Sequence, residues 1–229
     1  IRGVLAEGAG SAWEVLTQLV AAPGTAGLHP LLVTGKTVAG AVPTLEALRS
    51  RIEAADPELA GRLGVVLDSA SPGVSGLALA RLEGRWRSQD WVPHVTAFFE
   101  AGESQLLVGT RALLGEGWDA RAITGLIDLT TATTATAVVQ TRGRSLRIDP
   151  RHPDKVAANW TVTCVAPDHP RGDNDYQRLV RKHTGYVGID GEGELVDGVA
   201  HLDGRLSPFA PPPLEALAPL HSAALARAE

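Results

Sequence analysis

The sequence predicts an α/β fold, in which a parallel β-sheet is covered by helices on both faces. Short, continuous apolar runs bounded by Gly or Pro recur along the chain, and such runs are typical of strands buried on both sides. Segments with apolar residues at helical spacing alternate with these runs. With 229 residues, of which 44% are hydrophobic and 21% charged, the chain is also long enough to bury a substantial core.

The helices and strands are expected in a regular alternation. An apolar stripe formed by Trp13, Val15, Leu16 and Leu19 indicates a first helix, which Pro23 ends. Further helices are expected over residues 41–55, over 92–102, where Gly102 closes the helix, and over 175–183, which a cap in 172–176 begins. Short apolar runs predict strands over residues 29–35, 61–69, 104–110, 124–130 and 160–166.

The last part of the chain has a different character. Gly-rich turns predict a β-hairpin with strands near residues 186–189 and 195–201. A Pro-rich linker over 207–213 and an Ala/Leu-rich helix interrupted by Pro219 follow it. We therefore expect an N-terminal helix and linker from a preceding domain over residues 1–27, the main domain over 28–185, and a small hairpin and helix extension over 186–229.

Composition excludes several classes of protein. The one cysteine, Cys164, cannot form an intrachain disulfide and is expected to be an inert core residue in a reducing, cytoplasmic environment. No apolar run reaches the roughly 18 residues of a membrane helix, so no membrane partner is expected. The net charge of −5 disfavours coating of nucleic acid by bulk electrostatics. Because the chain starts at Ile1 and contains no Met, we expect it to be a piece of a longer polypeptide.

Two weaker signals are set aside. The sequence TGKT at 34–37 resembles the end of a phosphate loop, but Pro30 stands where that motif needs its first Gly. A strand-to-helix turn is the better interpretation, and its amides are still able to meet a phosphate of another kind. The seven histidines are scattered without metal-ligand spacing, so no metal site is predicted.

Two segments carry the functional prediction. Residues 106–120 combine a buried strand with Thr110 at its carboxyl end and a loop that contains Gly117 and Asp119. Residues 138–150 contain the pattern Q-x-x-G-R-x-x-R. In a doubly wound sheet both segments would project from the same carboxyl edge, where ligands bind.

The second pattern suits a phosphoryl group. Arg144 and Arg147 share one face if the segment is helical, and two guanidiniums can grip several phosphate oxygens. Gly143 removes a side chain where close approach is needed, and Gln140 can hydrogen-bond a phosphate oxygen or a water. The alternative is an ordinary solvated basic face, made by the five cations Arg142, Arg144, Arg147, Arg151 and Lys155.

On these residues the two segments resemble motifs V and VI of superfamily 2 helicases, and residues 28–168 resemble the second, C-terminal RecA-like domain of that family. The run HPLLVTGKT falls where the motif IV strand and turn are expected. GEGWD together with QTRGRSLR is most similar to the DEAD/DEAH-like, DNA-directed members. The resemblance implies a RecA-like parallel sheet and an ATP-dependent helicase or translocase.

The resemblance also implies roles for individual residues. Arg144 and Arg147 would be arginine fingers, and Gln140 would sense the γ-phosphate. The residues implied at the ATP interface are Gly117, Asp119 and Gly143. Those implied to contact backbone phosphates of DNA, or of RNA, are Thr110, Thr34 and Gly35. Asp119 as a helix cap and Thr110 as a plain strand end stay open, and Trp118 is expected to be a packing residue.

The resemblance covers one of the two RecA-like domains that an ATP-dependent helicase of this family needs. ATP and Mg²⁺ would be bound mainly by a first RecA-like domain of the same polypeptide, which these 229 residues do not contain, so we expect the chain alone to be inactive. Two other functions stay open. One is a DNA-dependent ATPase subunit of a restriction or repair system that does not unwind duplex, and the other is a non-catalytic RecA-like scaffold.

Overall fold

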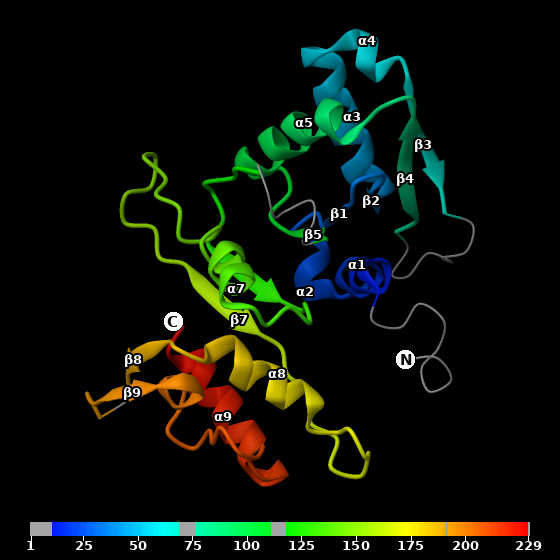
Figure 1. The fold of residues 1–229 in the computed structure, drawn as a ribbon. Coiled ribbons are helices and arrows are strands. Elements are labelled where there is room, and N and C mark those ends of the chain that lie inside the picture. Colours follow the sequence, from blue (N-terminus) through cyan, green and yellow to red (C-terminus); the bar gives the residue numbers. More distant parts are fainter. Residues whose placement is uncertain (1–10, 69–76, 111–117, 191, 229) are drawn as a thin grey trace. The chain divides into compact units, whose positions relative to one another are not determined.

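The computed structural model describes residues 11–68, 77–110, 118–190 and 192–228 (Figure 1). The chain divides into two compact units, Ile1–Ala122 and Ile123–Glu229. The domain predicted over residues 28–185 includes parts of both units, and its bounds stay a prediction. Each unit is described by itself below.

The first unit contains a mixed five-stranded sheet with the strand order β3-β4-β2-β1-β5. Its strands are β1 (Leu31–Val33), β2 (Val38–Ala41), β3 (Leu63–Leu67), β4 (Leu79–Gly84) and β5 (Leu107–Gly109). Strands β1 and β5 are parallel, whereas the other three pairings are antiparallel. The α/β class is therefore confirmed, but the expectation of a wholly parallel sheet does not hold for this sheet.

The antiparallel pairings have a local cause. The turn at 34–37 leads straight from β1 into β2, so the predicted strand-to-helix turn is wrong and the segment is a β-hairpin turn. Gly40 allows the two strands to close, because a Cβ there would lie 2.9 Å from a methyl carbon of Leu31. Strand β4 was not predicted, since Arg81 and Glu83 interrupt its apolar run.

Helices pack on both faces of this sheet. The helices of the unit are α1 (Ala12–Ala21), α2 (Pro23–Ala26), α3 (Val42–Ala55), α4 (Pro57–Ala60) and α5 (Ser88–Glu100). Leu31 and Val33 face the apolar side chains of α3 and α5, while Leu32 between them faces α1. The helices predicted over 41–55 and 92–102 are confirmed, and Gly102 follows α5 with φ of 76°.

The second unit begins with a β-α-β motif. Strand β6 (Gly125–Asp128) and strand β7 (Ala158–Thr161) are parallel, and helix α7 (Ala135–Arg142) lies between them in the chain. Parallel neighbours need such a crossover connection. The strand predicted over 124–130 is confirmed, while that over 160–166 starts earlier and ends at Thr161.

The expectation that Cys164 lies in a buried strand is wrong. Cys164 is exposed, and its backbone N–H donates to a carboxylate oxygen of Asp175 at 2.8 Å. The backbone here bonds to a side chain of the next helix rather than to a neighbouring strand, which explains why the ladder stops at Thr161.

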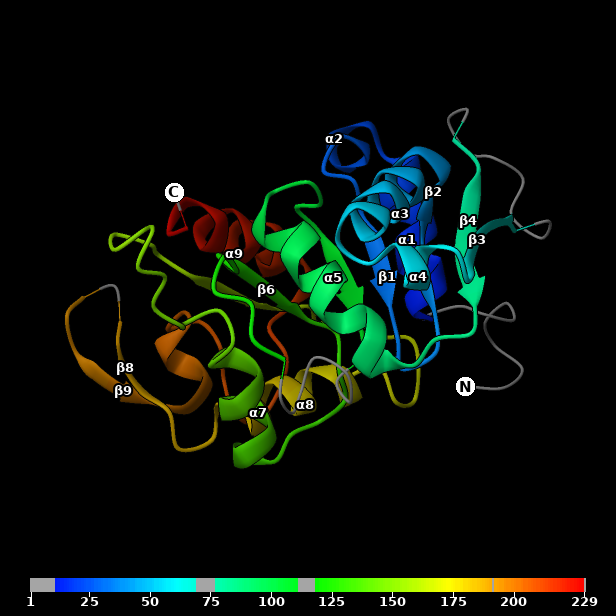
Figure 2. The same ribbon diagram turned by 90° about the horizontal axis from the view of Figure 1, so that it is seen from above.

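The rest of the second unit contains helix α8 (Asn174–His183), strands β8 (Val187–Ile189) and β9 (Leu195–Asp197), the 3-10 helix η1 (Gly198–His201) and helix α9 (Leu214–Ala226). The predicted hairpin and final helix are confirmed, and Figure 2 shows β8 and β9 alongside each other in orange. The second strand is shorter than expected because Gly198 turns the chain with φ of 71°. Tyr176, Leu179 and Val199 form the small core of this part.

Candidate functional site

Two of the predicted phosphate contacts lie at one edge of the first sheet. Thr34 directly follows Val33, the last residue of β1, and Thr110 directly follows Gly109, the last residue of β5. Because Val33 and Gly109 are paired in register in parallel strands, both threonines lie at the same carboxyl edge. Ligands of open α/β sheets bind outside this edge.

The turn after β1 uses most of its own polar groups. The Thr34 hydroxyl accepts hydrogen bonds from the backbone N–H of Thr37 at 3.0 Å and of Lys36 at 3.3 Å. The Thr34 N–H in turn donates to the Thr37 carbonyl oxygen at 2.8 Å. The amides of Lys36 and Thr37 therefore stabilise the turn. The Gly35 backbone and the Lys36 side chain are exposed to solvent.

Lys36 is a residue that the sequence reasoning missed. It lies exposed in the turn between Thr34 and β2, next to the shared edge of β1 and β5. An ammonium group on a flexible stem can contact a phosphate without any requirement on its orientation. The signal is present in TGKT, but only the backbone amides and the residues Thr34 and Gly35 of that turn were predicted to meet a phosphate.

The end of the first unit holds Trp118 and Asp119. Trp118 is 7% exposed, its Nε1–H donates to the Thr96 hydroxyl at 2.9 Å, and its ring centre lies 6.4 Å from that of Phe99. The prediction that Trp118 is a packing residue is confirmed. Asp119 beside it is exposed, and Gly117 lies outside the described residues.

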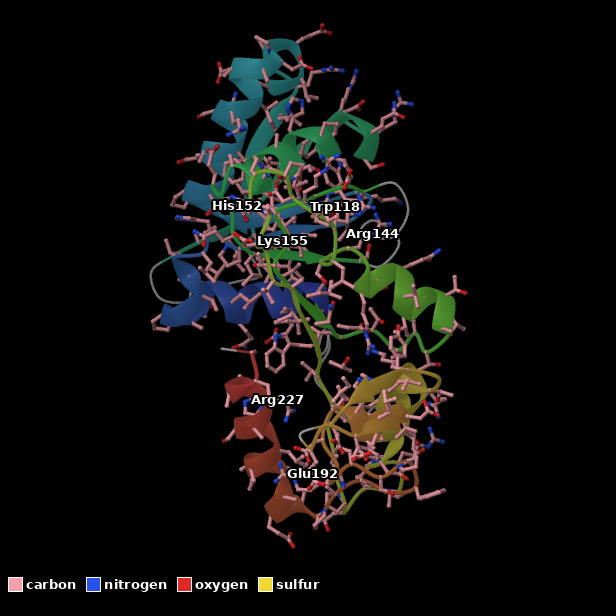
Figure 3. The ribbon with its side chains drawn as sticks, turned by 90° about the vertical axis from the view of Figure 1, so that its left-hand side faces the viewer. Trp118, Arg144, His152, Lys155, Glu192 and Arg227 are labelled. Atoms are coloured by element: carbon pink, nitrogen blue, oxygen red, sulfur yellow. The ribbon has the colours of Figure 1, made fainter. Side chains whose placement is uncertain are left out.

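The arginine pattern lies at and beyond the end of α7. Gln140 is exposed in the last turn of the helix, and Gly143 is its C-cap. Arg144 is half-buried in the turn over 143–146, beside α7 in Figure 3, and Arg147 follows that turn. The condition that the helix continues through Arg147 is not met, so a shared helical face does not bring the two arginines together.

Gly143 has a steric reason to be glycine. Its N–H donates to the Val139 carbonyl oxygen at 2.8 Å, and a Cβ at this position would lie 3.0 Å from the same oxygen. Its φ of −59° is ordinary, so backbone conformation does not require glycine here. The absent side chain therefore leaves room for the Val139 carbonyl group, and the expected close approach of a phosphate to Gly143 stays a prediction.

The turn that carries Arg144 is fixed on both sides. The fully buried hydroxyl of Ser145 lies 2.9 Å from the Arg142 carbonyl oxygen and 2.9 Å from the side-chain oxygen of Asn159 on β7. The Arg142 guanidinium donates to Nε2 of His183 at 2.8 Å and lies 4.9 Å from the centre of the Tyr186 ring. These contacts join the end of α7 to β7, to the end of α8 and to Tyr186 beyond it.

Two other cations of the basic cluster, Arg151 and Lys155, have internal partners. Arg151 donates from Nε to Asp149 Oδ1 at 3.1 Å and from its terminal nitrogen to Oδ2 at 3.2 Å. These hydrogen bonds lower the pKa of the buried Asp149 carboxyl. Lys155 donates to the Ile123 carbonyl oxygen at 3.0 Å. The basic cluster is therefore not a uniform solvated face.

A buried ion pair joins β6 to α8. Lys182 Nζ lies 2.8 Å from Asp128 Oδ2 and 2.6 Å from the Thr130 carbonyl oxygen. The two side chains are only 2% and 6% exposed. Burial opposes the ionised form of Asp128, but hydrogen bonds from Lys182 and Thr130 outweigh it and lower the pKa of the carboxyl.

Lys182 and His183 are further residues that sequence reasoning did not single out. Tyr176, Leu179 and His183 follow an i, i+3, i+7 spacing, which places His183 on the buried stripe of α8. That spacing was the available signal for His183. The sequence gives no comparable signal for the contacts that Lys182 and His183 make. The residues that they contact, Asp128 and Arg142, lie in other elements.

Comparison with known proteins gives no relative: no protein-family model, no curated protein and no solved structure matches this chain. Within the part of the chain that the structure describes, no helix is both long and apolar enough to cross a membrane.

Proposed function

We propose that this chain is the C-terminal RecA-like lobe of an ATP-dependent helicase or translocase that acts on DNA in the cytoplasm. The observation that carries the proposal is the set Gln140, Arg144 and Arg147, which lies within eight residues at the end of the crossover helix of a β-α-β motif. The exposed side-chain amide of Gln140 lies about one turn before Arg144, and the backbone of Arg144 is held by the contacts of its neighbour Ser145.

The chemistry of this set suits a phosphoryl group in transfer. ATP bound on the first lobe would be the substrate, and the bond to its γ-phosphoryl group would be hydrolysed. Arg144 and Arg147 would donate hydrogen bonds to the phosphoryl oxygens and stabilise the charge that develops on them. Gln140 would hydrogen-bond a γ-phosphate oxygen or the attacking water.

Mg²⁺ prefers carboxylate oxygens and water as ligands, and two buried carboxylates of the second unit, Asp128 and Asp149, are engaged by cations. Asp149 is engaged by Arg151, and Asp128 is engaged by Lys182. This agrees with a role in which the chain supplies cations and the first lobe holds the metal ion.

The nucleic-acid part of the proposal rests on the edge shared by β1 and β5. Thr34 and Thr110 follow adjacent parallel strands, and the exposed Gly35 and Lys36 lie beside Thr34. A hydroxyl, a bare backbone and an ammonium group suit backbone phosphates and carry no information about base identity. We expect binding through this edge to be independent of sequence and to weaken with salt.

The proposal implies a longer polypeptide in which a first RecA-like lobe is joined to this chain. The experiment that tests it is hydrolysis of ATP by that polypeptide, with and without single-stranded DNA. Stimulation by DNA supports the motor, and a strand-displacement assay on a tailed duplex then separates a helicase from an ATPase that does not unwind. Hydrolysis that is absent, or indifferent to nucleic acid, contradicts the proposal and leaves the scaffold.

A further inference from the structure

His183, in the last turn of α8, makes an unusual contact with the arginine segment. It is 3% exposed, and its Nε2 lies 2.8 Å from a terminal nitrogen of Arg142. A guanidinium only donates hydrogen bonds, so Nε2 must be the acceptor. The imidazole is therefore neutral and carries its one proton on Nδ1.

This arrangement does not serve stability alone. Nδ1 is buried and has no hydrogen-bond partner among the described residues, which costs free energy. The ring is also surrounded by other titratable groups: Arg142, Lys182, Tyr186 and His201. Burial, followed by the charges of Arg142, His201 and Lys182, lowers the pKa of His183 to about 3. An apolar side chain would fill the same space without the unsatisfied N–H.

What the histidine provides is a fixed acceptor for Arg142. Arg142 is the last residue of α7, and its guanidinium is held between Nε2 of His183 and the face of the Tyr186 ring. Two residues later the chain reaches Arg144, and the buried Ser145 hydroxyl anchors the next position. The backbone on both sides of Arg144 is thus held by side-chain contacts.

We propose that His183 is a positioning residue for Arg144: it accepts a hydrogen bond from Arg142 and so fixes the direction in which the arginine-bearing turn leaves α7. This inference rests on the proposed function, in which Arg144 contacts the phosphoryl group. His183 itself contacts no substrate. Its effect reaches the reaction through the placement of one backbone segment, and a small misplacement of a catalytic group is costly.

Two substitutions separate positioning from packing. His183→Gln keeps a side-chain acceptor, whereas His183→Leu keeps the bulk and loses the acceptor. In the longer polypeptide we expect His183→Leu to lower kcat about 10- to 100-fold with KM for ATP nearly unchanged. We expect His183→Gln to recover most of that loss, and the Tm of both variants to stay within about 4 °C of the wild type.

The outcomes distinguish this inference from the proposed function. If Arg144→Ala abolishes turnover while His183→Leu leaves kcat unchanged, or if Gln and Leu impair kcat equally, the positioning role is wrong and the proposed function stands. If the wild type shows no hydrolysis, both are wrong. Nitrogen NMR of this chain gives a third test, since a protonated His183 ring at pH 6 would overturn the contact with Arg142 whatever the activity.

Discussion

Lys182 Nζ lies 2.8 Å from Asp128 Oδ2, and this contact spans 54 residues of sequence between α8 and the end of β6. The next residue, His183, contacts Arg142 at the end of α7 across 41 residues. The last turn of α8 therefore fixes both the strand that precedes α7 and the helix itself. Helix α8, which lies beyond the residues 28–168 that resemble the RecA-like domain, therefore supports the arginine-bearing turn.

The Lys182–Asp128 pair should matter strongly for stability when one partner is removed. Lys182→Met leaves a buried carboxylate without its cation, and we expect the free energy of unfolding to fall by about 3–5 kcal/mol. Adding Asp128→Asn should restore part of that loss, because the isolated charge is removed. Urea unfolding of the wild type and both variants measures this.

A matched control lies on the same helix. Arg178 lies 3.1 Å from Asp175, and both side chains are 36% exposed, so Arg178→Ala should cost about 1 kcal/mol or less. A loss for Lys182→Met that is no larger than that of Arg178→Ala would show that the pair contributes little in the folded chain.

His183 should make stability depend on pH. Its pKa is lowered from 6.5 to about 3 on folding, so the unfolded chain binds more protons between these values. The contribution of His183 to the free energy of unfolding is fully present above pH 6.5. It is lost as the pH drops toward 3, by up to about 1.4 kcal/mol per pH unit. Denaturant unfolding of the wild type and His183→Gln at pH 7 and pH 5 measures the effect, since the two proteins differ only at this side chain. Equal losses in the two proteins would contradict the buried, neutral histidine.

Cys164 should react readily in the folded chain. Because it is exposed, a thiol reagent is expected to modify the native protein at a rate close to that of the unfolded chain. Cys164→Ser is the control for reaction elsewhere. Modification that occurs only after denaturant is added would return Cys164 to the buried position that its apolar surroundings suggested.

Trp118 should act on stability and not on nucleic-acid binding. Trp118→Phe removes the hydrogen bond to Thr96 and should cost about 1–2 kcal/mol, whereas Trp118→Ala should cost about 3–5 kcal/mol. The affinity of the chain for single-stranded DNA, measured by fluorescence anisotropy, should not change in Trp118→Phe. A clear loss of affinity would instead assign the ring to base stacking.

The sequence predicts local structure well and pairing direction poorly. The apolar stripe of α3 and the Gly-rich hairpin over residues 186–197 were found because their signals lie within a few residues of each other. The antiparallel pairing of β1 with β2 depends on how Thr34 closes its turn, which composition does not encode. For the site, the pattern from Gln140 to Arg147 was visible as a motif, whereas the contacts that hold it come from α8 and β7.

The most direct test of the proposed function compares ATP hydrolysis, with and without single-stranded DNA, by the longer polypeptide and its Arg144→Ala variant. Arg178→Ala serves as the control, because it removes an arginine of the same unit that is paired on the surface. We predict that DNA stimulates the wild type and the control, and that Arg144→Ala lowers the maximal rate by about 10³-fold with little change in ATP affinity. A variant that turns over ATP at the wild-type rate, or that loses affinity and not rate, would contradict the assignment of Arg144 as an arginine finger.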